Sequence, residues 1–208
     1  MRIGLCLAAA FLLTSCGTPV APATPAPESA EEYIERGESL AEQGLYPEAI
    51  DHFSGAIEME PENGEAFFLR GRAHYDYAVK LSVETTGQPP GGVPFLPQEV
   101  TEQMELAVAD YSVAVGLSPL YAKAYNNRGN ARATLGDLEG AVEDYDQALE
   151  LDGSLDLTYF NRGAIHYQLR NYAAAIADLE MYLELVPDAE DRARVEALIE
   201  EMKGASAP

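Results

Sequence analysis

Cysteine, tryptophan and positive charge are all scarce in this sequence of 208 residues. Both cysteines, Cys6 and Cys16, lie close to the N-terminus, so the rest of the chain has neither a disulfide bond nor a thiolate metal site. Tryptophan is absent, and 13 Lys and Arg residues stand against 35 Asp and Glu, giving a formal net charge of -22. Such a charge repels the phosphates of nucleic acids, which argues against a nucleic-acid-binding protein.

The sequence also lacks the patterns of an enzyme or a cofactor site. It has no plausible nucleophile–base pair, no glycine-rich phosphate loop and no dinucleotide fingerprint. The three histidines, His52, His74 and His166, do not pair at metal-ligand spacing on one helix, so we assign them structural roles. We therefore predict a protein that is not an enzyme and that has no cofactor and no metal site.

The chain begins with a short apolar run. Arg2 precedes residues 3–13, which are too few to cross about 30 Å of hydrocarbon, a distance that takes roughly 20 residues. The tetrapeptide Leu-Thr-Ser-Cys that ends at Cys16 resembles the bacterial lipobox, in which the chain is cut before a cysteine that carries lipid. We predict a lipoprotein signal peptide at residues 1–15 and a lipid anchor, palmitate included, at Cys16. The alternative is an ordinary secretory signal followed by an incidental cysteine.

The residues after Cys16 form a proline-rich linker. Residues 17–29 hold four prolines and almost nothing that could pack, which predicts a semi-rigid spacer that lifts a folded domain off a bilayer. The expected location is the outer face of a bacterial cell membrane or outer membrane. In the lipoproteins that this segment resembles, a residue such as Gly17 after the cysteine fits sorting to the outer membrane.

Four kinds of residue recur at matching intervals through the rest of the chain. Arg-Gly pairs have glycine spacings of 34, 58 and 34 residues, and alanines, large apolar residues and helix breakers follow the same register. We interpret the glycines and alanines as packing positions where two helices approach closely, with the large residues between successive hairpins. The glycines are Gly37, Gly71, Gly129 and Gly163, the alanines Ala49, Ala107, Ala141 and Ala175, and the large residues Phe53, Tyr111, Tyr145 and Leu179.

These columns resemble the tetratricopeptide repeat (TPR), a unit of 34 residues with small residues at positions 8, 20 and 27. The resemblance implies an all-α, right-handed solenoid over residues 30–203, built from four helix-turn-helix units and closed by a capping helix, with a tail at residues 204–208. The units are 30–63, 64–121, 122–155 and 156–189, and the cap is 190–203. Arg170 departs from the family pattern, because a turn glycine is usual there.

The second unit carries 24 extra residues between its two helices. We expect two lengthened helices, from Glu65 to about Ser82 and from Gln98 to Leu117, as an extended hairpin around a loop at residues 85–97. Glycines and prolines exclude helix from this loop. Its apolar residues either touch a partner or fold back on the hairpin, and they are Val93, Phe95 and Leu96.

Helical spacing also predicts which residues line the concave face of such a solenoid. This face changes from acidic to aromatic to amide-bearing along the stack, which suits a peptide with basic and apolar residues. The candidate groove residues are Phe68, Arg72, Tyr75, Lys123, Asn126, Asn127, Asn130, Phe160 and Tyr167. The Lys, Arg and Asn clamp by which chaperone-binding TPR domains hold a C-terminal carboxylate is absent.

The arginines beside the repeat glycines are expected to be structural, because Asp110, Asp144 and Asp178 recur in step with them on the second helices. The function we expect is a scaffold or adaptor, tethered at the membrane through Cys16, that binds peptide or protein clients of the cell envelope in its groove. The resemblance is to bacterial TPR lipoproteins. A structural lipoprotein that forms a homo-oligomer and holds no client is the alternative, and mass in solution separates the two.

Overall fold

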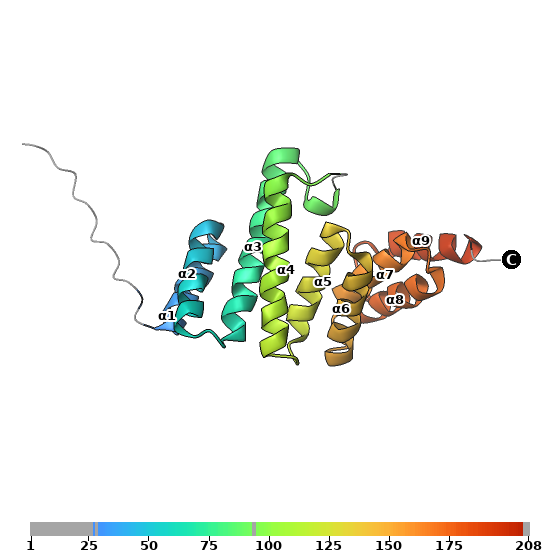
Figure 1. Cartoon of the computed structure of the whole chain (residues 1–208). Coiled ribbons are helices and arrows are strands. Elements are labelled where there is room, and N and C mark those ends of the chain that lie inside the picture. Colours follow the sequence, from blue (N-terminus) through green and yellow to red (C-terminus); the bar gives the residue numbers. More distant parts are fainter. Residues whose placement is uncertain (1–26, 28, 93–94, 206–208) are drawn as a thin grey trace, which may run out of the picture.

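The computed structural model describes residues 27, 29–92 and 95–205 (Figure 1). The predicted signal peptide, Cys16, most of the linker and Val93 lie outside these residues. The part of the chain that the structure describes consists of α-helices joined by short turns, with one 3-10 turn and no strand. None of its helices is both long enough and apolar enough to cross a bilayer.

The helices follow one another as antiparallel pairs, with a single helix at the end (Figure 1). The first two pairs are α1 (Ala30–Glu42) with α2 (Tyr46–Met59), and α3 (Gly64–Thr86) with α4 (Gln98–Leu117). The next two are α5 (Ala122–Leu135) with α6 (Leu138–Leu151), and α7 (Asp156–Gln168) with α8 (Tyr172–Leu185). The last helix is α9 (Arg192–Ala205).

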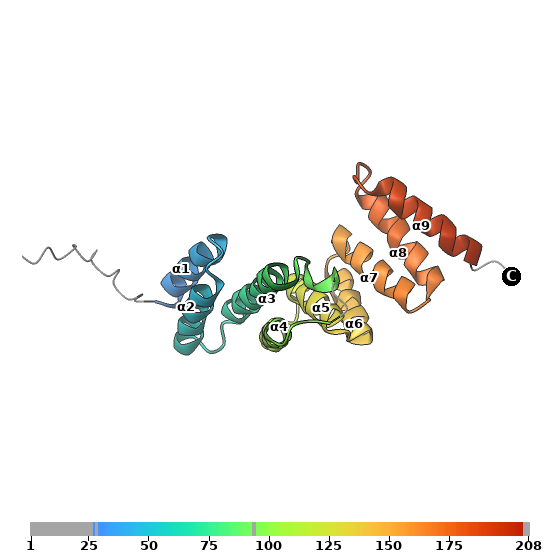
Figure 2. The same ribbon diagram turned by 90° about the horizontal axis from the view of Figure 1, so that it is seen from above.

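The helices stack in chain order into an elongated array, as the view from above shows (Figure 2). Each helix packs against the next one along the chain, and the first helices of successive pairs also meet: α1 touches α3, α3 touches α5, and α5 touches α7. These first helices therefore form one continuous inner layer. A surface made by this layer draws on side chains from several pairs at once.

Short polar side chains begin several of these helices. Ser29, Asn63 and Asp137 each accept a hydrogen bond from a backbone N–H three residues later, which satisfies a donor that the helix itself leaves free. The turns inside the hairpins need a left-handed residue, which glycine supplies at Gly44 and Gly136 with φ values of 74° and 87°.

In the last hairpin, Arg170 occupies this left-handed position with φ 61°. A side chain there brings Cβ close to the following carbonyl oxygen, and only glycine avoids that cost. We expect Arg170→Gly to raise the free energy of unfolding by about 1 kcal/mol, measured by urea denaturation. The same exchange at the exposed helical residue Arg194 should lower stability instead, because glycine is unfavourable inside a helix. A loss of stability at both positions would contradict the strain argument.

The repeat glycines lie directly under the large residues of their own hairpins. A Cβ added to Gly37 or Gly129 would come within 2.6 Å of the Phe53 ring and 2.7 Å of the Tyr145 ring, respectively. The large residues thus cover the glycine within their own hairpin, and Phe53 and Leu179 also belong to clusters that include residues of the next helix along the stack, as expected. The repeat alanines Ala49, Ala107, Ala141 and Ala175 are fully buried, as expected for close packing.

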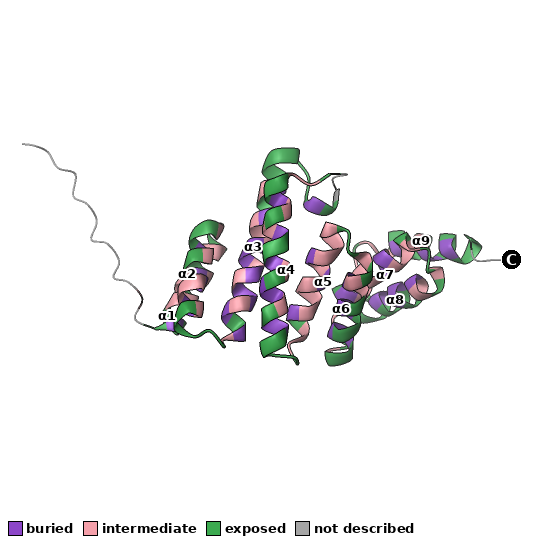
Figure 3. Ribbon diagram, in the orientation of Figure 1, coloured by how far each residue is buried: buried purple, intermediate pink, exposed green. Residues whose placement is uncertain are grey.

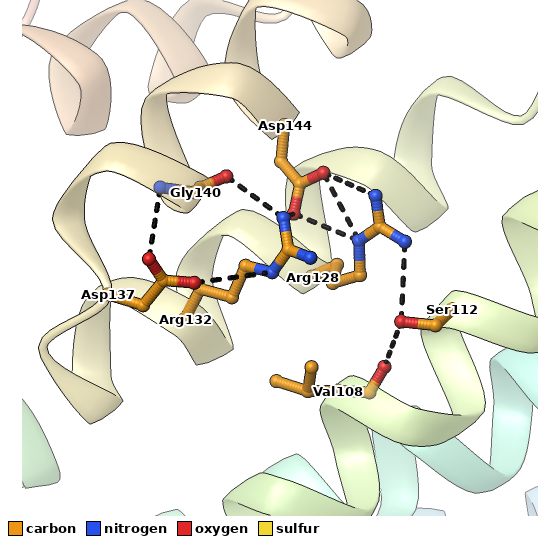
Figure 4. Close-up of polar contacts among 7 residues, drawn as sticks. All are labelled: Val108, Ser112, Arg128, Arg132, Asp137, Gly140 and Asp144. Atoms are coloured by element: carbon orange, nitrogen blue, oxygen red, sulfur yellow. Dashed lines mark hydrogen bonds and ion pairs between the residues drawn. The ribbon is translucent and has the colours of Figure 1, made fainter.

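Each repeat arginine of the last three pairs binds the aspartate that recurs with it, which confirms the structural role. Arg70 holds Asp110 at 2.7 Å, Arg128 holds Asp144 at 2.6 Å, and Arg162 holds Asp178 at 2.6 Å. Each guanidinium also donates to a side chain of the preceding hairpin, namely Ser54, Ser112 or Asp146. The arginines thus tie neighbouring pairs together, and Figure 4 shows this arrangement around Arg128.

The insertion makes α3 and α4 longer than the other helices (Figure 1). Helix α3 runs to Thr86, four residues beyond the expected end, and Gly87 then stops it with φ 75°. The loop is not free of helix, contrary to our expectation, because Pro90–Gly92 forms a 3-10 turn, η1. The hydroxyl of Ser82 donates to the carbonyl of Gln88 at 2.8 Å, which ties the start of the loop back to α3.

Helix α9 covers the last hairpin. Its apolar side chains Val195, Ile199 and Met202 are buried against α8, where they pack on a cluster that includes Leu179 and Leu183. The remaining faces of α9 are exposed, as the burial pattern shows (Figure 3). This helix provides the cover that the end of a stack needs.

Candidate functional site

Two adjoining hollows lie on the inner layer of helices. The larger, of about 410 Å³, spans α3, α5 and α7, and the smaller, of about 180 Å³, lies between α3, α4 and α5. They share Tyr75 and Asn130, so we treat them together as the groove. The larger hollow is lined by Tyr75, Pro90, Gly91, Asn130, Ala133, Thr134, Tyr145, Asn161, Ala164, Ile165 and Gln168, and the smaller by Arg72, Tyr75, Asp76, Tyr111, Asn127 and Asn130.

The insertion forms part of the groove wall. Pro90 and Gly91 of η1 line the larger hollow together with residues near the C-terminal ends of α5 and α7. Both views place η1 beside the end of α5 (Figures 1 and 2). The extra residues of the second unit therefore reach over to the third and narrow the groove at one end. The sequence pattern did not predict this arrangement.

Amide side chains connect α5 and α7 along the floor of the groove. Asn130 accepts hydrogen bonds from the Tyr145 hydroxyl at 2.8 Å and from the Asn161 amide at 3.0 Å. Asn126 accepts from the Thr158 hydroxyl at 2.7 Å and donates to Asn127 at 3.0 Å. These bonds fix the position of the amides, and Asn130 lines both hollows.

Four of the nine predicted groove residues line the hollows: Arg72, Tyr75, Asn127 and Asn130. Lys123 is exposed but lines neither hollow. Asn126 uses its carbonyl oxygen to hold Thr158, so it links α5 to α7 and does not line the hollows either. Helical spacing alone placed Lys123 and Asn126 too close to the centre of the groove.

The predicted aromatic anchors are largely committed to packing. Phe68 is 6% exposed and lies against the rings of Tyr111 and Tyr121, so its assignment to the groove was wrong. Phe160 is partly buried with its ring centroid 5.2 Å from that of Tyr182, and it faces α9. Tyr167 similarly packs on Tyr172, with 5.9 Å between the ring centroids, and lies outside the groove. Large rings at these positions gain more by covering the next helix than by facing solvent.

The smaller hollow contains a carboxylate that is not among the nine candidate groove residues. Asp76 is partly buried, and burial raises its pKa, while the charge of Arg72 lowers it to a lesser extent. Arg72 itself leans towards Glu38 on α1, with 3.9 Å between the charged atoms. Among the described residues, none forms a hydrogen bond or an ion pair with the Asp76 carboxylate.

Several groove residues escaped prediction because their repeat columns suggested packing alone. Tyr111 and Tyr145 are buried in the packing column, yet both also line the groove. Burial raises the pKa of both hydroxyls. Asn161 occupies the same repeat position as Asn127, 34 residues earlier, and that match could have identified it.

The predicted contact residues of the loop differ in their burial. Phe95 is 88% exposed, whereas Leu96 packs on a cluster that includes Val100 and Met104. Val93 lies outside the described residues. Leu96 therefore folds back on the hairpin, and Phe95 is the large apolar side chain that the described part of the loop offers to solvent.

Two of the three histidines have the partners expected of structural residues. His74 is buried with Nδ1 2.7 Å from the Gln103 side chain, and burial lowers its pKa. His52 has Nδ1 3.0 Å from the carbonyl of Glu48. His166 differs, because its buried Nδ1 has no hydrogen-bond partner in the described structure.

Three family models match the chain. Two are described as tetratricopeptide repeat and match residues 34–76 and 157–200, and one described as TPR repeat matches residues 129–170. Together they cover more than half of the sequence. The chain belongs to the tetratricopeptide-repeat proteins. This confirms the all-α TPR solenoid. TPR proteins are generally non-catalytic interaction scaffolds, and no enzymatic family is indicated.

Solved TPR structures resemble this one. The first TPR of Spaghetti (RPAP3) bound to the HSP90 peptide SRMEEVD is 28% identical, with 68% of this chain and 93% of that chain covered and a TM-score of 0.55. MamA, in its crystal structure, is 18% identical over 84% of this chain and 82% of its own, with a TM-score of 0.65. MamA from Desulfovibrio magneticus is 20% identical over 78% of each chain, with a TM-score of 0.60. No curated protein sequence matches the chain.

Proposed function

We propose that this TPR protein is a scaffold that holds an extended segment of another protein in the groove on α3, α5 and α7. The observation that carries the proposal is that amide side chains from two successive helix pairs line the groove, namely Asn127, Asn130 and Asn161. Amide groups both donate to and accept from a peptide backbone. The RPAP3 TPR, which is similar in fold, is described as bound to a peptide.

The insertion supplies two further features of the proposed site. Pro90 and Gly91 border the groove, so a bound segment passes beneath η1. Phe95 is exposed close to them in sequence and offers a second, apolar contact to the protein that carries the segment. Aromatic side chains of this kind commonly dominate the energy of an interface.

We also propose that the domain is tethered to the outer face of a bacterial membrane through lipid on Cys16, with residues 17–29 as the spacer, and that its clients are cell-envelope proteins. The support is the sequence pattern alone. A chain with Cys16→Ala that still fractionates with membranes would contradict the anchor. The wild-type chain should appear in the membrane fraction and release only with detergent.

Affinity capture from membranes tests the groove. We expect Gln168→Arg to deplete the captured proteins, because Gln168 lines the groove and a long cationic side chain there obstructs it. The matched control is Gln147→Arg, the same exchange at an exposed position of the outer helix α6. Identical sets of captured proteins for both variants would show that the groove is the wrong surface. A stable dimer with the groove covered, detected by mass in solution, would favour the structural oligomer instead.

A further inference from the structure

We propose that the smaller hollow of the groove is a pocket for one basic side chain, lysine or arginine, of the bound segment, with Asp76 as the opposite charge. This inference rests on the proposed function and names the chemistry that the groove selects. It concerns the hollow lined by Arg72, Tyr75, Asp76, Tyr111, Asn127 and Asn130.

The first support is that the Asp76 carboxylate has no partner in the described structure, although it lies partly buried on the inner layer. The buried repeat aspartates behave differently: Asp110, Asp144 and Asp178 each bind an arginine at 2.6 to 2.7 Å. Buried carboxylates are costly unless they are paired. A carboxylate that the fold partly desolvates and leaves unpaired is suited to a charge that arrives from outside.

The nearby arginine does not fill this role. Arg72 precedes Asp76 by one helical turn, but its guanidinium lies 3.9 Å from Glu38 on the neighbouring α1. Arg72 also lines the hollow and its charge lowers the pKa of Asp76, but it forms no ion pair with that carboxylate in the described structure. The volume of about 180 Å³ holds several side-chain atoms, since a water molecule occupies roughly 30 Å³.

The walls of the hollow also fit a basic side chain. Tyr75 is the partly buried aromatic residue of the lining, and aromatic rings attract cations and accept the methylene stem of lysine or arginine. Asn127 and Asn130 offer amides for the backbone on either side. An acidic segment would instead meet Asp76 and Glu38 and be repelled, so a basic segment is favoured.

The partial burial of Asp76 also affects the free energy of folding, in a direction that agrees with this assignment. The pKa of Asp76 is raised, so its ionised form destabilises the empty fold at neutral pH, and stability increases as the pH falls through that pKa. The titratable groups around Asp76 are Arg72 and Tyr75 on α3, Tyr111 on α4 and Tyr46 on α2. We therefore expect Asp76→Asn to melt at or above the wild-type temperature at pH 7, while it loses selectivity for a basic side chain.

An array of nonapeptides tests the pocket with the full chain. Each position of an alanine and serine background is replaced in turn by Lys, Arg, Gln, Leu or Glu, and labelled protein is bound to the array. The best lysine peptide is then compared with its norleucine analogue, which keeps the stem and lacks the charge, by fluorescence anisotropy. We expect norleucine to bind the wild type about tenfold more weakly, which is about 1.4 kcal/mol, and to bind Asp76→Asn as well as lysine does.

The control is Asp51→Asn, which removes the same charge from an exposed position on α2 and should keep the tenfold preference. Peptides that bind without a preference for Lys or Arg, or a preference that survives in Asp76→Asn, would overturn the pocket and leave the groove in place. Binding of no peptide in the array would overturn the proposed function, and the pocket with it.

Discussion

Replacing Gly129 by leucine is expected to lower the free energy of unfolding by about 3 kcal/mol or more. Even a single added carbon at Gly129 would lie 2.7 Å from the Tyr145 ring, closer than real carbon contacts allow. The ring cannot move aside at low cost, because it is 1% exposed and its hydroxyl donates to Asn130 at 2.8 Å. Urea denaturation of the variant and the wild type measures the effect.

The matched pair Gly129→Ala and Gly163→Ala isolates this contact. A Cβ at Gly163 would lie 3.2 Å from the Cβ of Asp178 and 3.2 Å from Leu179, which is tight but needs only a small shift. Both exchanges gain the same helix propensity of about 1 kcal/mol, so this gain cancels in the comparison. We expect Gly163→Ala to stay within about 1 kcal/mol of the wild type and Gly129→Ala to be clearly less stable. Equal effects at the two positions would refute the role assigned to Tyr145.

The same contact connects packing with the groove. Tyr145 covers Gly129 with its ring and holds Asn130, which lines both hollows, with its hydroxyl. A glycine selected for close packing thus determines where a groove amide lies. The Gly129 variants should therefore weaken capture of partners even at temperatures where they remain folded.

The helices and the ion pairs could be predicted from the sequence because both follow the repeat period. The glycines and prolines of the insertion placed Gln98–Leu117 at its observed bounds, and the 34-residue spacing matched Arg128 with Asp144 and Arg162 with Asp178. Each of these features depends on contacts within one hairpin, which every unit repeats. The regular spacing in the sequence is therefore enough to predict such contacts.

The groove was less predictable because it depends on contacts between units. Phe68 occupies a position that helical spacing turns inward, yet Tyr121 covers it, and only the stacked structure brings that ring to 4.7 Å. The path of the insertion has no period at all, so nothing in the sequence indicated that Pro90 and Gly91 border the groove. Asp76 stood among many acidic residues, and its lack of a partner is visible only in three dimensions.

The second large effect is expected at Asp144, which is 2% exposed as a side chain and binds two arginines. Arg128 and Arg132 both donate to its carboxylate, and Arg128 also reaches Ser112 of the preceding pair (Figure 4). Removing a buried carboxylate leaves these positive charges without their main partner. We expect Asp144→Ala to lower the free energy of unfolding by about 3 to 5 kcal/mol.

Asp146, two residues further along the same helix, provides the control. Its side chain is 55% exposed and binds Arg162 at 2.6 Å, and exposed pairs of this kind contribute about 0.2 to 1 kcal/mol. Asp146→Ala should therefore have a small effect that 1 M salt removes, while the Asp144→Ala effect should persist in salt because the buried pair is poorly screened. Unfolding curves at low and high salt measure both. If the two variants proved equally mild, the buried arginine–aspartate pair would not be what holds the hairpin of α5 and α6 together. The rigidity of the groove would then have to come from the amide contacts between α5 and α7.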